Sequence, residues 1–393
     1  MRFPEFSGEW EKYVLTEFVE RVTRRNKGNE CKLPLTISAQ YGLVDQITFF
    51  NKIIASDDMS NYYLLTNGDF AYNKSYSSEY PWGAIKRLDR YEYGALSSLY
   101  ICFRPLNHVS SDFLTHYFET KKWHQGISEI AVEGARNHGL LNIGIQDFFA
   151  TKHYLPQSIL EQEKIACFLN LIEERIRLQN KIIEKYESLI QAIIYQKKTD
   201  GIRKGNWQKT ELSKVLQERT EKNINGYTVC SVSVSQGIIN QIEYLGRSFA
   251  AKETSHYNVV KYGDIVYTKS PTGDFPYGIV KRSYIKNAVA VSPLYGVYKP
   301  IDDNIGVILH FYFMQPNNAF NYLHPLIQKG AKNTINITNT RFLENSIPLP
   351  KTEDEAVYIA NALTRIQTKI DIEKSLLRSY EREKQYLLRQ MFI

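Results

Sequence analysis

The sequence predicts an α+β protein made of two β-rich domains, each followed by one long helix. Two observations lead to this fold class. Residues 68–87 recur without a gap as residues 263–282, with nine of twenty positions identical. In addition, each copy ends in a helix-start signal that leads into a heptad pattern of apolar residues. A repeat of about 195 residues is too long for a solenoid unit and has room for a domain plus an appended helix.

The duplication runs along the whole chain. Residues near the start of each copy match, namely Trp10, Lys12 and Leu15 with Trp207, Lys209 and Leu212. Further on, the G-A-R-N run at 134–137 matches G-A-K-N at 330–333, and LPQSILE at 155–161 matches LPKTEDE at 349–355. Because the offset drifts only from 197 to 194 residues, coincidence is excluded.

Each copy begins with a β-rich part and ends with a helix. Short apolar runs such as 63–65 and 265–267, bounded by Gly, Pro, Asn and Asp, predict strands. We therefore expect domains at 1–157 and 207–350. An S/T-x-x-E pattern follows each domain, at 158–161 and 352–355. In such a capping box the hydroxyl accepts from the third helical N–H and the glutamate reaches back to the cap, which predicts helices over 158–198 and 351–393.

Apolar residues at 3-4 spacing mark a coiled-coil seam on both helices. They are Ile165, Leu169, Ile172, Ile176, Ile183, Tyr186 and Ile190 in the first helix, and Ile359, Leu363, Ile366, Ile370, Leu377, Tyr380 and Leu387 in the second. Since one seam must bury its stripe somewhere, the simplest partner of each helix is the other helix. The alternative is that each helix packs separately on its own domain.

Two polar features interrupt this pattern. Gln179 and Glu373 occupy equivalent seam positions, where a polar residue either fixes the register or marks a break exposed to solvent. Between the two copies, the segment 199–206 is polar and contains glycine, so we expect a linker there.

Cysteine spacing and charge exclude other classes of protein. Four cysteines, each more than sixty residues from the next, argue against a zinc site and against a disulfide scaffold. The sequence has no apolar signal region at its start and no run of eighteen apolar residues, so we expect a reduced, cytoplasmic protein. Residues 201–350 carry a net charge of +7, whereas residues 1–157 carry −1. Only the second domain therefore shows the bulk basic charge that is usual in nucleic-acid binders.

This layout resembles the specificity (S) subunits of type I restriction–modification enzymes. The resemblance covers nearly the whole chain. Its most specific parts are the "LP…EQ…I…FL" opening with its heptad helix at 154–194 and the echo at 347–392, where Glu353-Asp354-Glu355 replaces the usual Glu-Gln pair. The G-D-x-x-Y-x-K-S run and the G-A-R/K-N loop also resemble landmarks of target-recognition domains.

The resemblance implies an architecture and a set of partners. The two helices would pair as an antiparallel coiled coil, which relates the target-recognition domains by pseudo-two-fold symmetry. Each domain would read one half of a bipartite target in double-stranded DNA, and the helices would set the spacer. Methyltransferase subunits, normally two, would dock on the helices, and motor-nuclease restriction subunits would join them.

The resemblance also implies where the chemistry takes place. The assembled complex would be an adenine-N6 DNA methyltransferase and type I site-specific endonuclease that serves phage defence. S-adenosylmethionine, ATP and Mg²⁺ would bind to the partner subunits. The chain itself would bind no cofactor and no metal and would have no catalytic residue.

Candidate DNA-binding residues fall into two groups. The first follows Gly-Ala in equivalent loops and offers paired donors and acceptors for base edges: Arg136, Asn137, His138, Lys332, Asn333 and Thr334. The alternative for these residues is a solvated polar turn. The second group belongs mostly to positions that recur in both copies: Lys74, Ser75, Tyr76, Lys86, Arg87, Lys269, Ser270, Lys281 and Arg282. Because two half-sites normally differ, recurring residues suit phosphate contacts or structural roles, and base readers are expected where the copies differ.

Enzyme motifs are weak in this sequence. Asp112 with Glu119-Thr120-Lys121 imitates a D…E-x-K nuclease pattern, but the second copy lacks it. Neither the N/D-P-P-aromatic tetrapeptide of adenine methylation nor a G-x-x-x-x-G-K-S/T phosphate loop occurs. His108, His116 and His124 are spaced by eight, which suits no zinc motif. Two other functions remain open: an elongated coiled-coil interaction protein without DNA binding, and a recognition subunit of another restriction-type system.

Overall fold

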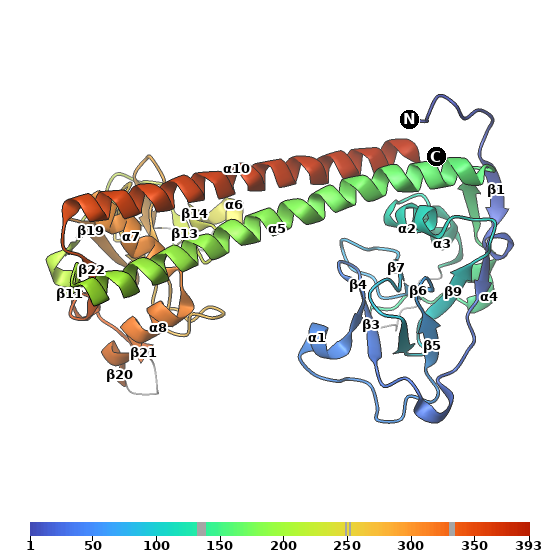
Figure 1. Ribbon diagram of the computed structural model, residues 1–393, viewed down its shortest axis with the longest axis horizontal. Helices are drawn as coiled ribbons and strands as arrows, with labels where there is room; N and C mark the ends of the chain where they lie inside the picture. The colour runs from blue at the N-terminus through green and yellow to red at the C-terminus, as the bar shows by residue number, and fades with distance from the viewer. Residues whose placement is uncertain (132–138, 248–249, 251–252, 330–334) are drawn as a thin grey trace. The chain divides into compact units, whose positions relative to one another are not determined.

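The computed structural model describes residues 1–131, 139–247, 250, 253–329 and 335–393 (Figure 1). They form two compact units, Met1–Leu178 with Leu377–Ile393, and Gln179–Leu376. Each unit contains one β-rich domain and parts of both long helices, α5 (Ile159–Lys204) and α10 (Glu353–Met391). The predicted α+β fold class, with two β-rich domains and two long helices, is confirmed.

The first domain is built on two antiparallel-rich sheets with short helices between their strands. Its strands are β1 (Glu11–Val14), β2 (Val19–Arg21), β3 (Pro34–Ser38), β4 (Gly42–Asp45), β5 (Tyr63–Thr66), β6 (Phe70–Asn73), β7 (Ala84–Arg87), β8 (Tyr93–Leu96), β9 (Ile101–Pro105) and β10 (Lys152–Leu155). Its helices are α1 (Gln46–Phe50), α2 (Ser111–Glu119), α3 (His124–Ile130) and α4 (Ile145–Phe149), with 3-10 turns at Leu15–Glu17 and Lys27–Asn29. The sheet orders are β2-β9-β6-β7 and β4-β3-β8-β5, and β1 pairs with β10.

The second domain repeats part of this plan. Its strands are β11 (Trp207–Glu211), β12 (Leu216–Glu218), β13 (Cys230–Ser233), β14 (Gly237–Asn240), β15 (Asn258–Val260), β16 (Ile265–Tyr267), β17 (Val280–Arg282), β18 (Val289–Val291), β19 (Gly296–Pro300), β20 (Gln328–Lys329), β21 (Ile335–Asn336) and β22 (Ser346–Pro350). Its helices are α6 (Gln241–Leu245), α7 (Asp303–Phe313), α8 (Pro316–Leu323) and α9 (Asn339–Phe342), with 3-10 turns at Leu212–Lys214 and His324–Leu326. The sheet order β12-β19-β16-β17 and the pair β11-β22 match the first domain, as the duplicated sequence predicts.

Both long helices contribute to the first unit's core. Trp10 on the N-terminal side of β1 and Phe113 of α2 pack with Leu169 of α5 in one buried cluster. The C-terminal end of α10 enters the same cluster through Met391, and Phe392 follows, with its ring centroid 5.2 Å from that of Phe113. The end of α10 therefore completes a core whose other residues come from the first copy.

The two long helices run antiparallel within each unit. In the first unit, Lys384 Nζ lies 2.6 Å from Glu173 Oε1, and Arg175 stacks over Tyr380. In the second unit, Gln179 donates to Glu373, and Lys197 lies over the ring of Tyr358. All fourteen seam residues predicted from the heptad pattern are buried or half-buried.

The predicted linker at 199–206 is wrong, because α5 continues through it to Lys204. Gly201 does not break the helix. It leaves room for Trp207, whose Cδ1 would lie 1.9 Å from a Cβ added at Gly201. The chain turns only at Gly205, which has a φ of +75°. There the N–H of Asn206 bonds the carbonyl of Gly201 at 2.8 Å, which closes the helix end. The glycine at position 201 is therefore explained by its packing against Trp207 and not by a flexible linker.

The predicted helix starts agree with the structure, but the glutamates of the two S/T-x-x-E patterns have another role. Glu161 is 1% exposed and accepts from the indole of Trp10 at 3.2 Å and from Arg2 at 2.7 Å. Glu355 accepts from the indole of Trp207 at 3.0 Å. Each glutamate therefore ties the first turn of a long helix to the first strand region of its domain.

Candidate nucleic-acid interface

The repeated Gly-Asp pair forms a buried turn before strand β6. Gly68 has a φ of +90°, which L side chains rarely adopt, and Asp69 is 2% exposed. The Asp69 carboxylate accepts from the backbone N–H of Thr66 at 2.8 Å and from Arg104 Nε at 3.0 Å. A carboxylate so deeply buried is stable only with such partners, so it shapes the turn and is not free to contact DNA.

The second copy satisfies the same aspartate from a different strand. Asp264 is 1% exposed and binds Arg219 through two hydrogen bonds of 2.6 and 2.9 Å. Arg219 follows β12, whereas Arg104 lies on β9. In both copies the buried aspartate has an arginine as its cationic partner, but the two arginines lie at positions that do not correspond. The sequence signal for this role is the identical Gly-Asp pair; the arginines escaped the sequence analysis because they do not align.

The basic pair on β7 is engaged by the helix that follows it. Lys86 forms an ion pair with Glu119 of α2. Arg87 donates to Asp112 of α2 at 2.6 Å and to Ser111 at 2.9 Å. These contacts also account for Asp112 and Glu119, whose nuclease-like spacing therefore reflects two structural ion pairs. Lys86 and Arg87 hold α2 against the sheet and are less suited to phosphate binding than the sequence suggested.

The equivalent pair on β17 lies still deeper. Lys281 is 4% exposed, and this burial lowers the pKa of its ammonium to about 8. Arg282 is 1% exposed, pairs with Asp303, and lies 4.8 and 4.7 Å from the ring centres of Tyr262 and Tyr284. Neither side chain can reach a duplex while α7 covers β17. The structure therefore contradicts the prediction that Lys281 and Arg282 contact DNA.

Lys74, Ser75 and Tyr76 lie on the connection between β6 and β7, beside the segment that follows residue 138. Ser75 forms a β-bridge with Leu140, and the N–H of Tyr76 bonds the carbonyl of Gly139 at 3.0 Å. Lys74 is half-buried, whereas Ser75 and Tyr76 are exposed. These three residues remain available for contact with a ligand.

Other candidates divide between exposed, half-buried and undescribed positions. In the second domain Ser270 is exposed and Lys269 is half-buried, and burial lowers the pKa of Lys269. The six residues predicted from the Gly-Ala loops lie outside the described residues: Arg136, Asn137, His138, Lys332, Asn333 and Thr334.

Among the described residues, no group of three or more His, Cys, Asp or Glu side chains is placed to hold a metal ion. His116 is fully buried and its Nε2 lies 2.8 Å from Asn170 Oδ1 of α5, as expected for a core histidine. No helix in the described ranges is long and apolar enough to cross a membrane.

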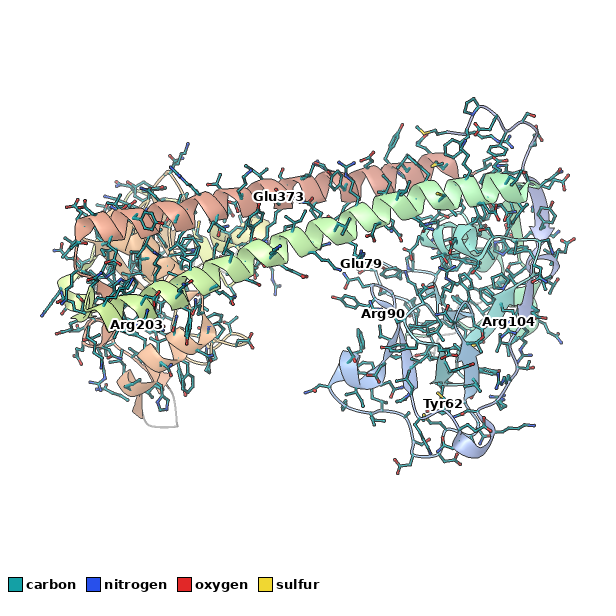
Figure 2. The ribbon with its side chains drawn as sticks, viewed as in Figure 1. Tyr62, Glu79, Arg90, Arg104, Arg203 and Glu373 are labelled. Carbon is teal, nitrogen blue, oxygen red and sulfur yellow. The ribbon has the colours of Figure 1, made fainter. Side chains whose placement is uncertain are left out.

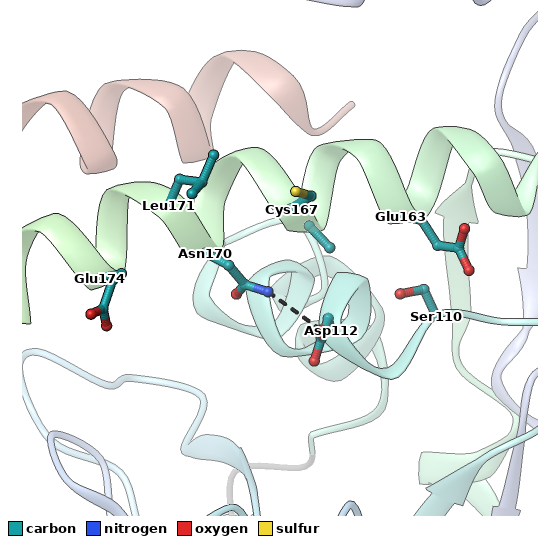
Figure 3. Close-up of a pocket in the computed structure, with 8 residues that line it drawn as sticks. Ser110, Asp112, Glu163, Cys167, Asn170, Leu171 and Glu174 are labelled. Carbon is teal, nitrogen blue, oxygen red and sulfur yellow. Dashed lines mark hydrogen bonds between the residues drawn. The ribbon is translucent and has the colours of Figure 1, made fainter.

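A hollow of about 510 Å³ lies between α2 and the first turns of α5 (Figure 3). Three carboxylate residues, Asp112, Glu163 and Glu174, line it together with Asn170, which donates to Asp112 at 3.3 Å. The lining residues include no Lys, Arg or His that would attract a phosphate, so we do not assign the hollow to DNA. Leu171 at its edge is 63% exposed.

Comparison with known families now becomes informative. A family model described as the type I restriction modification DNA specificity domain matches residues 207–382, the second domain and most of α10. The first domain repeats the same sheet order and the same Gly-Asp turn. The second domain with most of α10 is therefore similar to the type I restriction modification DNA specificity domain.

Solved structures share the fold of this chain. The S subunit of a type I restriction–modification system from M. genitalium superposes with a TM-score of 0.55 at 12% identity, covering 100% of this chain and 99% of that one. A chain from a structure described as the basis of complex assembly and conformational transition of the type I R-M system gives 0.51 at 14% identity, with 98% of each chain covered. At such identities the likeness concerns the fold.

Proposed function

We propose that this chain reads a bipartite target in double-stranded DNA, one half-site with each β-rich domain. The observation that carries the proposal is the duplication: two domains that share the order of one four-stranded sheet, the second of which matches the specificity-domain family model, are joined to the same pair of helices. Two domains of like fold and unlike surface suit two half-sites of unlike sequence, and the helices between them set the spacer.

Partner subunits would dock on the outer faces of the helices. In the first unit α5 exposes Leu171 and Leu178, seven residues apart, and in the second unit it exposes Ile182 and Leu189, also seven apart. Residues seven apart share one helix face, so apolar pairs at this spacing favour a helical partner. We assign this surface to methyltransferase subunits, normally two, with restriction subunits joining the complex.

The chemistry would belong to those partners. S-adenosylmethionine would bind to the methyltransferase subunits, and ATP and Mg²⁺ to the subunits that methylate, translocate or cut. This chain selects the DNA target and, on this proposal, contains no catalytic residue. A subunit that directs the methylation and restriction of DNA would work in the cytoplasm.

Methylation-aware sequencing of host DNA tests the proposal. Cells that express the chain with its methyltransferase subunit should carry N6-methyladenine in one bipartite motif, and cells that lack this chain should not. The motif should consist of two specified half-sites around an unspecified spacer. An unchanged methylome in the presence and absence of the chain would contradict the proposal.

A further inference from the structure

The connections β6–β7 and β16–β17 are built on one stem. In the first domain the hydroxyl of Tyr72 donates to the carbonyl of Trp82 at 2.9 Å, and in the second Tyr267 donates to Tyr277 at 2.9 Å. A glycine follows in each, Gly83 with a φ of +79° and Gly278 with +95°. A Cβ on Gly83 would lie 2.2 Å from the Asn73 carbonyl oxygen, and one on Gly278 would lie 1.9 Å from that of Thr268.

The outer turns of the two connections also share their backbone hydrogen bonds. The N–H of Ser77 bonds the carbonyl of Tyr80 at 3.1 Å, and the N–H of Thr272 bonds that of Phe275 at 3.0 Å. The carbonyls of Tyr80 and Phe275 also accept from Gly83 and Gly278, at 3.1 and 3.3 Å. Both connections therefore share these hydrogen bonds on similar stems, while the backbone differs at the third position of the turn, where Gly273 has a φ of +49° and Ser78 does not have a positive φ.

None of the five side chains on these turns is identical, although Ser77 and Thr272, Glu79 and Asp274, and Tyr80 and Phe275 are pairs of one chemical kind. Between the shared Lys-Ser and the shared Pro, residues 76–80 read YSSEY and residues 271–275 read PTGDF, with no identity in five positions. The first four residues of each pentapeptide are exposed, while Tyr80 is half-buried and Phe275 is buried. A constant scaffold that presents variable exposed residues is the arrangement of recognition loops on rigid domains.

Each turn presents a carboxylate at its fourth position. Glu79 (Figure 2) and Asp274 are both exposed, and no ion pair is found for either within the described residues. Near DNA an unpaired carboxylate is repelled by phosphates, so it is favourable there only where it accepts a hydrogen bond from a base. The donors that suit a carboxylate in the major groove are the amino groups of cytosine and adenine.

We propose that residues 76–80 and 271–275 read base edges in the two half-sites, with Glu79 and Asp274 each accepting from the amino group of a cytosine or an adenine. The inference rests on the proposed function and names its specificity-determining residues. The shared Lys-Ser pairs beside the turns lie where a phosphate contact would fix the register, and the differing residues supply sequence preference.

Reciprocal substitutions in the full chain, expressed with its methyltransferase subunit, test the assignment. Glu79→Gln should change the preference at one position of one half-site by about tenfold, because the amide replaces one of the two acceptor oxygens by a donor, and should leave the other half-site unchanged. Asp274→Asn should do the same in the other half-site. Glu92→Gln is the matched control, an exposed carboxylate at the opposite end of the β6–β7 hairpin, where its carbonyl accepts from Asn67. It should change neither half-site.

A loop exchange covers the case in which a single substitution abolishes methylation. Replacing residues 77–80 by TGDF keeps the length, the flanking residues and the hydrogen bond from the N–H of Tyr76 to the Gly139 carbonyl, so the melting temperature should stay close to that of the wild type while the first half-site changes. The identity of the altered base distinguishes cytosine from adenine. If Glu79→Gln and the exchange variant both methylate the original two half-sites, the inference is overturned. A wild-type chain that directs no bipartite methylation would instead refute the proposed function.

Discussion

At the scale of single residues, His153 shows how the interior of the first domain fixes a protonation state. The side chain is 3% exposed; its Nε2 lies 2.8 Å from Thr151 Oγ1 and its Nδ1 lies 3.0 Å from the Tyr117 hydroxyl. Because Thr151 donates its own proton to the carbonyl of Phe148, Nε2 must carry the hydrogen and Nδ1 must accept. Burial lowers the pKa of His153 to about 4.

This histidine predicts a loss of stability in acid. The unfolded chain binds a proton at His153 below a pKa of about 6.5, whereas the folded chain does so only below about 4. Keeping His153 neutral therefore costs the folded state nothing above pH 6.5. As the pH falls towards 4, the free energy of unfolding decreases by about 3 kcal/mol in all. His153→Gln should reduce the decrease in melting temperature between pH 7 and pH 4.5. His108→Gln, at an exposed position, is the control and should leave that decrease as in the wild type.

At the scale of elements, the polar positions of the two seams meet each other. Gln179 is 5% exposed, and its amide donates to the Glu373 carboxylate at 2.6 Å and to the Glu373 carbonyl at 3.2 Å. The solvent-exposed break, one of the two interpretations of these positions, is therefore not what the structure contains. A directional bond between unlike side chains favours one register of the helix pair over others.

A double-mutant cycle measures this contact. Glu373→Leu should destabilise the second unit by about 1–3 kcal/mol, because it removes the carboxylate acceptor of the buried Gln179 amide and leaves only the backbone carbonyl. Adding Gln179→Leu should recover most of that loss, since two leucines continue the apolar seam. Urea unfolding of the wild type, both single variants and the double variant gives the coupling energy. Strictly additive effects would show that the contact does not stabilise the pair.

At the scale of the whole molecule, the continuity of α5 through residues 199–204 bears on the proposed spacer. A helix rises about 1.5 Å per residue and resists bending more than a flexible linker does. An unbroken helix from the first domain to the turn at Gly205 is therefore suited to act as a ruler.

Lengthening both helices by one heptad tests this idea. Repeating residues 173–179 after Gln179 and residues 367–373 after Glu373 keeps the seam and gives each new junction a Gln–Glu contact. Seven residues add about 10 Å, equal to about three base pairs. Methylation mapping should show the original half-sites with a spacer about three base pairs longer.

The insertion has its own control. Four residues added to α5 alone should misalign the seam and abolish methylation. Three base pairs also rotate one half-site about the duplex axis, so a reduced methylation level agrees with the model. An active heptad variant that keeps the original spacer would contradict it.

Local and periodic features of this protein were predictable from its sequence. The duplication, the helix starts after Ser158 and Thr352 and the seam all follow from short-range patterns that recur twice. Such patterns depend on backbone periodicity and on neighbours within a few residues, so they predict the local structure that forms. The landmark pair Gly68-Asp69 and its counterpart were also visible, although their structural role was not.

Roles that depend on which elements meet were decided by the tertiary structure. Lys281 and Arg282 are of the residue types that commonly contact DNA, yet α7 covers them. Glycine is common in linkers, yet Gly201 packs against Trp207 inside a helix. Burial and ion pairing arise between residues far apart in the chain, and no pattern around Arg282 or Gly201 specifies those partners. The sequence by itself determined two β-rich domains and two paired helices, whereas the folded chain decided which charged residues face solvent.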